Sequence, residues 1–129
     1  MILFDTTVLI DLERESQRGT PGPVVSFLQS IPEEHPAISV ITVGEFGEGF
    51  VEHTFEAFSS RLVPYTVILI DERIAWRYAL ISREGRSKGI RIGDNDLWIA
   101  ATAIEHRLCV LTRNTRHFNR ITGLLVQEY

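Results

Sequence analysis

Two carboxylates precede an apolar helical pattern in the stretch Gly93-Asp-Asn-Asp-Leu-Trp-Ile-Ala-Ala-Thr-Ala103. A helix N-terminus favours negative charge because its first backbone N–H groups lack partners. One aspartate, Asp94 or Asp96, can serve as the N-cap, so capping leaves the other carboxylate unexplained. Apolar residues then recur at helical spacing and predict one buried stripe, made by Leu97, Ala100, Ala101, Ile104 and Leu108.

Short apolar runs alternate with helical patterns along the rest of the chain. Helices are expected at 6–10, 24–30, 42–52, 54–62, 71–86 and 94–107, with loops at 14–23 and 83–91. Strands are expected at 2–4, 37–40, 66–70, 109–112 and 124–126, with 66–70 the strongest signal. Three of these runs are continuously apolar, which is typical of a parallel sheet covered on both faces. We therefore predict an α/β fold with a central five-stranded parallel sheet flanked by helices, forming a single domain over residues 1–129.

The composition excludes several classes of protein. The 129 residues are 44% hydrophobic and 23% charged, which is ordinary for a soluble globular protein, and no apolar run is long enough to span a membrane. The N-terminus lacks the pattern of a signal peptide. A single cysteine, Cys109, excludes an internal disulfide and a Cys-based zinc site, so we expect a reducing, cytoplasmic location.

Charge is distributed unevenly along the sequence. Residues 1–70 carry three arginines against ten acidic residues, a net charge of −7, whereas residues 71–129 carry ten basic against seven acidic residues, a net charge of +3. The overall charge of −4 argues against a protein that coats nucleic acid. An acidic half beside a basic half suits a site where carboxylates hold a cation and arginines hold phosphates, although ordinary solvation also produces such patterns.

Four acidic residues stand at positions where a parallel α/β fold brings side chains together. Asp5 follows the first strand, Glu45 lies on the predicted helix 42–52, and Asp94 and Asp96 begin a later helix. Polar groups at the carboxyl ends of parallel strands converge on one crevice. Clustered carboxylates repel one another unless they are protonated or bind a cation, and Mg²⁺ and Mn²⁺ prefer oxygen ligands. The pattern therefore predicts a carboxylate site for a divalent metal.

Some of these features also have an ordinary structural explanation. Glu45 shares one side of its predicted helix with Glu48 and Glu52, which is typical of a solvated face. The basic loop 83–91 suits solvent as well as it suits phosphates. The four histidines show no metal-ligand spacing, and the sequence contains no P-loop, dinucleotide loop or nucleophile elbow.

Four segments of this sequence resemble the successive motifs of PIN-domain ribonucleases, and in particular VapC-like toxins. The resemblance covers almost the whole chain, in order and at the usual spacing. It implies a three-layer PIN-like fold and a Mg²⁺- or Mn²⁺-dependent endoribonuclease acting on RNA. It also implies a homodimer and a cognate VapB-like antitoxin that inserts a segment into the active-site groove. The segments are Ile2-Leu-Phe-Asp-Thr6, Ser39-Val-Ile-Thr-Val-Gly-Glu45, Asn95-Asp-Leu-Trp-Ile-Ala-Ala-Thr-Ala103 and Val110-Leu-Thr-Arg-Asn-Thr-Arg-His-Phe118.

The same resemblance implies roles for individual acids. Asp5, Glu45 and Asp96 fall on the family's metal-binding acids. Asp96 matches rather than Asp94 because it directly precedes the Leu-Trp-Ile-Ala-Ala run. Asn114 stands where the family often has a fourth acid, and we expect it to complete the catalytic site with one neutral oxygen. Asp94 is then expected to be the helix cap, with a possible additional part in metal binding.

Other residues are expected to support the acids or to bind RNA. The hydroxyl groups of Thr6 and Thr112 are placed to orient the acids by hydrogen bonding. Asn114 in place of an acid also motivates an alternative function, a catalytically silent PIN-like module that binds RNA or protein. The residues expected to hold the RNA backbone are Arg113, Arg116, Arg86, Lys88 and Arg91.

Overall fold

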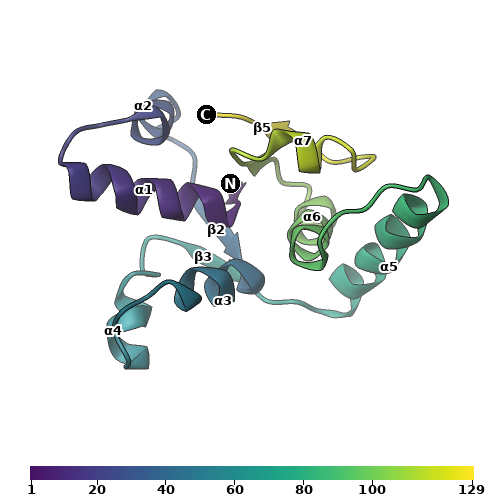
Figure 1. The fold of residues 1–129 in the computed structure, drawn as a ribbon, viewed down its shortest axis with the longest axis horizontal. Coiled ribbons are helices and arrows are strands. Elements are labelled where there is room, and N and C mark those ends of the chain that lie inside the picture. Colours follow the sequence, from purple (N-terminus) through teal and green to yellow (C-terminus); the bar gives the residue numbers. More distant parts are fainter.

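A computed structural model describes all residues, Met1–Tyr129, as five strands and seven helices (Figure 1). The strands form one sheet in which every pairing is parallel, in the order β3-β2-β1-β4-β5. The predicted five-stranded parallel sheet flanked by helices is therefore confirmed. The elements are β1 (Ile2–Phe4), α1 (Thr6–Arg18), α2 (Pro23–Ser30), β2 (Pro36–Ser39), α3 (Val40–Glu48), α4 (Phe55–Ser60), β3 (Thr66–Ile68), α5 (Glu72–Ser87), α6 (Asp94–His106), β4 (Val110–Leu111), α7 (Thr115–Phe118) and β5 (Val126–Gln127).

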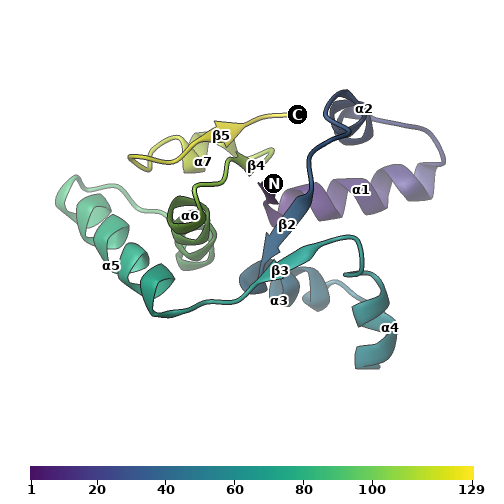
Figure 2. The same cartoon turned by 180° about the vertical axis from the view of Figure 1, so that it is seen from behind.

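Both faces of the central strand β1 are buried, and each face contributes to a separate core. Leu3 packs with residues of α6 and α7, whereas its neighbours Ile2 and Phe4 pack with residues of α1, α2 and α3. This alternation follows from the strand geometry, in which successive side chains point to opposite faces. Helix α5 lies at one end of the molecule, with α6 between it and the sheet, and α4 lies toward the other end (Figures 1 and 2).

Helix α1 is longer than the sequence pattern indicated, so the prediction of a loop over 14–23 is wrong for its first half. The helix continues to Arg18 and ends at Gly19, which has the left-handed conformation (φ 73°) that a glycine C-cap favours. The extra turns place Glu15 inside the protein, where it is only 3% exposed. Its two carboxylate oxygens accept hydrogen bonds from the backbone N–H groups of Val24 and Val25, each at 3.0 Å, and so cap α2.

Two further boundaries differ from the prediction. The strand signal at 66–70 gives only three paired residues, because Leu69 and Ile70 lie beyond the pairing of the edge strand β3 with β2, in the connection to α5. The expected basic loop begins later than residue 83, since α5 continues to Ser87. A salt bridge of 2.8 Å between Lys88 and Glu84 and a left-handed turn at Gly89 (φ 68°) mark this helix end.

The carboxyl ends of β1 and β4 lead directly into side chains expected at the site, and the carboxyl end of β2 leads into α3, which carries Glu45. Asp5 follows β1, Ser39 ends β2 and caps α3 by accepting from the Ile41 N–H at 3.1 Å, and Thr112 follows β4. These three strands are adjacent in the sheet, so the residues that follow them lie at one edge. None of the helices has the length and apolar character needed to cross a membrane.

Candidate metal and active site

Asp5 lies at the end of β1 and is buried, with 3% of its surface exposed. Its Oδ2 accepts hydrogen bonds from the hydroxyl of Thr7 at 3.0 Å and from the hydroxyl of Thr112 at 2.8 Å. Burial raises the pKa of Asp5. The hydrogen bonds from the two threonines oppose this increase, and the negative charge of Asp96 adds to it. Asp5 and Thr112 are 107 positions apart in the sequence. They lie side by side because the strands that precede them, β1 and β4, are paired in parallel.

Glu45 lies on α3 and reaches the same edge of the sheet. Its Oε1 accepts a hydrogen bond of 2.6 Å from the Thr6 hydroxyl, and its Oε2 accepts one of 3.3 Å from the Asn95 side-chain amide. Glu45 is half-buried whereas Glu48 is exposed, and α3 ends before residue 52. The interpretation that Glu45 lies on a solvated helix face is therefore wrong, because side chains of α1 and α6 contact its carboxylate.

Asp96 lies in the first turn of α6 and is the third carboxylate of the site. Burial raises its pKa, a contact with His117 opposes that shift, and the negative charge of Glu45 adds to it. The charge of Asp96 in turn raises the pKa of Asp5. Asp96 is therefore close enough to both other acids for their charges to interact, which brings three elements of the fold together at one site.

The contacts of these three acids suit a cation. Lysine and arginine side chains pair with carboxylates elsewhere in the protein, but none pairs with Asp5, Glu45 or Asp96. As the side chains stand, no group of three or more His, Cys, Asp or Glu residues is close enough to hold a metal ion. The donor chemistry fits Mg²⁺ or Mn²⁺, because the site offers several carboxylate oxygens whose mutual repulsion a divalent cation would relieve.

The two expected supporting threonines contact the acids directly. Thr6 donates to Glu45, and Thr112 donates to Asp5. Thr112 also accepts a hydrogen bond from the backbone N–H of Asn114 at 2.9 Å, which holds the start of α7 against the site. The Asn114 side chain makes no hydrogen bond and is half-buried, so its amide oxygen stays available.

Asp94 does not occupy the position expected for it. Gly93 is the N-cap of α6, and no side chain caps the helix. Asp94 Oδ1 instead accepts a hydrogen bond of 2.9 Å from the Tyr78 hydroxyl on α5. The prediction that Asp94 is the cap is therefore wrong, and its contact with α5 places it apart from the three coupled acids.

The basic residues expected to bind RNA divide into paired and unpaired groups. Arg113 donates to both oxygens of Asp11, at 2.8 and 3.0 Å, and Lys88 pairs with Glu84. The remaining three are exposed and form no ion pair, so their full charge faces solvent: Arg86, Arg91 and Arg116.

His117 and Asn95 contact the acids but were not anticipated as site residues. The Nδ1 atom of His117, on α7, lies 3.3 Å from Oδ2 of Asp96, and the ring donates there when Nδ1 carries the proton. Histidine spacing could not reveal this contact, because it joins two helices and is made to a carboxylate. Asn95 precedes Asp96 within the quoted stretch, yet only the approach of α3 to α6 gives it a partner.

We predict that His117→Ala weakens divalent-cation binding and lowers RNA cleavage about 10-fold or more, because hydrogen bonds orient metal-binding carboxylates. His117→Asn should restore much of the loss, since the asparagine amide can donate near the position of Nδ1. The measurements are kcat, KM and calorimetric Mn²⁺ affinity, with His106→Ala on the exposed end of α6 as the control. Unchanged Mn²⁺ affinity in His117→Ala would show that this contact does not support the site.

Comparison with known proteins shows the family of this chain. Residues 2–124 match the PIN domain. The chain therefore belongs to the PIN-domain family, and the resemblance noted in its sequence is confirmed.

Within this family, the relatives are named as ribonucleases or as toxins. The chain is 35% identical to Ribonuclease VapC1 of Methanocaldococcus jannaschii, over 99% of this chain and 86% of the relative. It is 33% identical to Toxin FitB of Neisseria gonorrhoeae, over 92% and 91% of the two chains. It also superimposes on a chain of the Rickettsia felis VapBC2 complex bound to promoter DNA, with a TM-score of 0.81, 25% identity, and 100% and 99% of the two chains covered. The chain is thus similar to VapC toxins along its length.

Proposed function

We propose that this protein is a metal-dependent endoribonuclease and the toxin of a toxin–antitoxin pair. The observation that carries the proposal is that Asp96 lies near enough to both Asp5 and Glu45 for their charges to interact, and that no lysine or arginine pairs with any of these three acids. The names of its relatives, Ribonuclease VapC1 and Toxin FitB, support the same activity.

The protein's own residues have distinct tasks in this proposal. The three acids hold Mg²⁺ or Mn²⁺, with Asn114 offering a further oxygen. When bound, such a cation activates water and stabilises charge on the phosphate. Thr112 and Thr7 fix the carboxylate of Asp5, while Thr6 and Asn95 fix that of Glu45. Because these donors are uncharged, they orient the acids without cancelling the charge that attracts the cation.

The proposed partner is a VapB-like antitoxin. The similar structures include a toxin–antitoxin complex from Klebsiella pneumoniae, with a TM-score of 0.73 and 32% identity over 97% of this chain and 96% of that chain. A cavity of about 420 Å³ lies next to Glu45 and combines the apolar Phe46 and Phe50 with Arg14 and Arg61. Such a surface suits a peptide segment that enters the site. We further propose that the protein acts in the cytoplasm as a homodimer.

RNA cleavage by the purified protein tests this function. We expect cleavage of single-stranded RNA with Mg²⁺ or Mn²⁺ and none in EDTA, because the acids need a cation to act on a phosphate. Calorimetry with Mn²⁺ at neutral pH separates this function from the silent alternative. RNA binding without Mn²⁺ binding or cleavage would contradict the enzyme and favour a PIN-like binding module.

A further inference from the structure

A second cavity lies on the far side of the first turn of α6 from the carboxylate site. Its volume is about 400 Å³, and it is bounded by α5, by residues 90–92 and by the start of α6. Asp94 lines the cavity, whereas Asp96, two residues further along the helix, faces the other acids. Residues two apart on a helix point in nearly opposite directions, so the cavity lies about one helix diameter, ~10 Å, from Asp96.

One wall of this cavity is held rigidly in place. The Tyr78 ring stacks on Trp98, with 4.0 Å between the ring centroids and 15° between the planes. The Tyr78 hydroxyl donates to Asp94 at 2.9 Å, and this hydrogen bond raises the pKa of Tyr78. The tyrosine is therefore fixed at both its ring and its hydroxyl, and the wall is ordered before any ligand binds.

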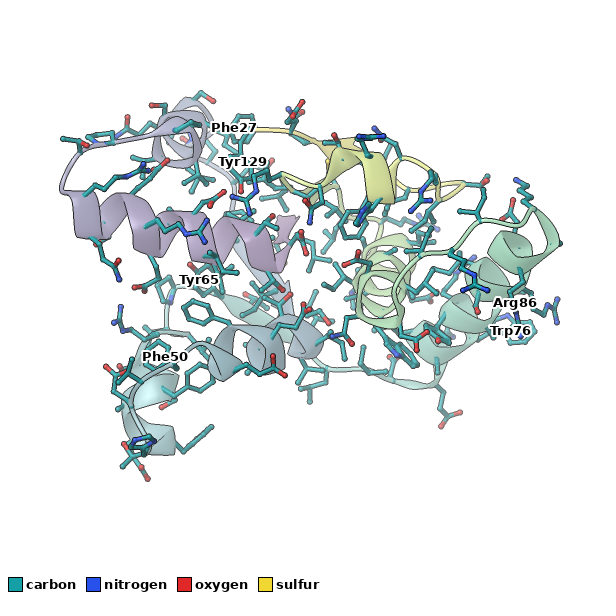
Figure 3. All side chains as sticks on the ribbon, in the orientation of Figure 1. Phe27, Phe50, Tyr65, Trp76, Arg86 and Tyr129 are labelled. Atoms are coloured by element: carbon teal, nitrogen blue, oxygen red, sulfur yellow. The ribbon has the colours of Figure 1, made fainter.

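The remaining walls combine apolar surface with unpaired positive charge. Ile81, Ile90 and Ile92 contribute apolar atoms. Arg86 and Arg91 also line the cavity, are exposed and form no ion pair. Figure 3 shows Arg86 on α5, at the opposite end of the molecule from Phe50. Phe50 lines the cavity beside Glu45. The two cavities are therefore separate surfaces on either side of the acids.

Apolar walls beside two guanidinium groups suit a nucleotide. The base of a nucleotide offers flat apolar faces, and the phosphate of the nucleotide accepts bidentate hydrogen bonds from arginine. A free carboxylate oxygen such as Oδ2 of Asp94 accepts hydrogen bonds from base amino groups. An acidic peptide would satisfy the arginines but would leave Asp94 facing a like charge.

We propose that this cavity binds an unpaired nucleotide of the RNA substrate, next to the phosphate held at the carboxylate site. The inference rests on the proposed function, since it names where the flanking part of the same RNA lies. Arg86 and Arg91 hold the backbone phosphate, and the isoleucine walls and Tyr78 receive the base. The cavity thereby selects single-stranded over duplex RNA, because a paired base cannot turn into it.

The experiment compares two ways of disabling the cavity. The double variant Arg86→Ala/Arg91→Ala removes the phosphate contacts, and Ser82→Phe fills the cavity without changing its charge. For a single-stranded oligoribonucleotide cleaved with Mn²⁺, we expect KM to rise about 10-fold in both, with kcat within about twofold of wild type. The control Arg18→Ala/Arg73→Ala removes two exposed arginines away from the cavity and should change KM less than about threefold. Thermal melting verifies that each variant is folded.

A binding measurement keeps this test independent of catalysis. Fluorescence anisotropy with the labelled oligonucleotide and Asp96→Asn protein should show the same loss of affinity when the cavity changes are added. If wild-type protein cleaves RNA but neither cavity variant alters KM or Kd, the cavity proposal is wrong and the proposed function stands. A loss in the arginine variant without one in Ser82→Phe also overturns it, because charge alone would then explain the effect. If wild-type protein cleaves no RNA, the proposed function fails, and anisotropy alone decides the cavity.

Discussion

Replacing Asp96 with asparagine is expected to abolish RNA cleavage, lowering kcat/KM at least about 100-fold. The substitution preserves the size of the side chain but removes a charged ligand from the cation site. Asp71→Asn is a matched control: Asp71 caps α5 by accepting from the Ile74 N–H at 2.9 Å, and asparagine caps helices equally well. Full cleavage by Asp96→Asn would contradict the proposed site.

The same substitution should not weaken the fold when metal is removed. Burial raises the pKa of Asp96 in the folded protein above its ordinary value of 3.8. The folded protein therefore binds the proton more tightly than the unfolded chain, and wild-type stability falls as the pH rises from about 4 through this raised pKa. In EDTA at pH 7 we expect the Tm of Asp96→Asn to equal or exceed that of wild type. Mn²⁺ should raise the Tm of the wild-type protein but not that of Asp96→Asn.

Replacing Glu15 with alanine is expected to destabilise the protein by about 2–4 kcal/mol, or roughly 10 °C in Tm. The change leaves the buried N–H group of Val24 and the partly buried N–H group of Val25 without acceptors and removes the cap of α2. It also empties the space beside Gly22, where a Cβ would collide with the Glu15 carboxylate. Urea unfolding followed by circular dichroism measures the loss.

Glu13→Ala provides the control for this prediction. Glu13 is on the same helix and forms a 2.8 Å salt bridge with the exposed Arg61. An ion pair at this surface contributes little, so the expected loss is below about 1 kcal/mol. Equal losses in the two variants would show that the hydrogen bonds from Glu15 to α2 do not set the stability of this region.

The sheet and its helical layers follow from local patterns in the sequence. Continuous apolar runs such as Ile2–Phe4 indicated strands buried on both faces, and the apolar stripe of residues 97–108 indicated the buried helix behind them. The ends of elements were less predictable. The polar stretch after Arg14 reads as a loop, because the sequence does not reveal that Glu15 gains two backbone partners across a turn.

The acids proposed for the site come from the sequence, but the groups that hold them were only partly anticipated. Asp5 stands out because it follows an apolar strand and has no evident structural use, whereas Asp96 was distinguished from Asp94 only by the resemblance to PIN-domain ribonucleases. Asp94 was assigned to capping because local rules favour a side-chain cap, whereas Tyr78 provides a partner from another helix. His117 was dismissed as a ligand on spacing, because its contact with Asp96 depends on how α7 packs against α6.

By itself, the sequence determined the class of fold and singled out candidate carboxylates such as Asp5 at the end of the first strand, because periodicity and residue type act over a few neighbouring positions. The tertiary structure decided which groups surround each carboxylate. Thr6 reaches Glu45 across 39 positions, and Thr112 reaches Asp5 across 107. In the stretch that begins at Gly93, packing sends Asp94 toward α5 and Asp96 toward the other acids. These contacts depend on the parallel order of the strands, which brings distant segments to one edge of the sheet.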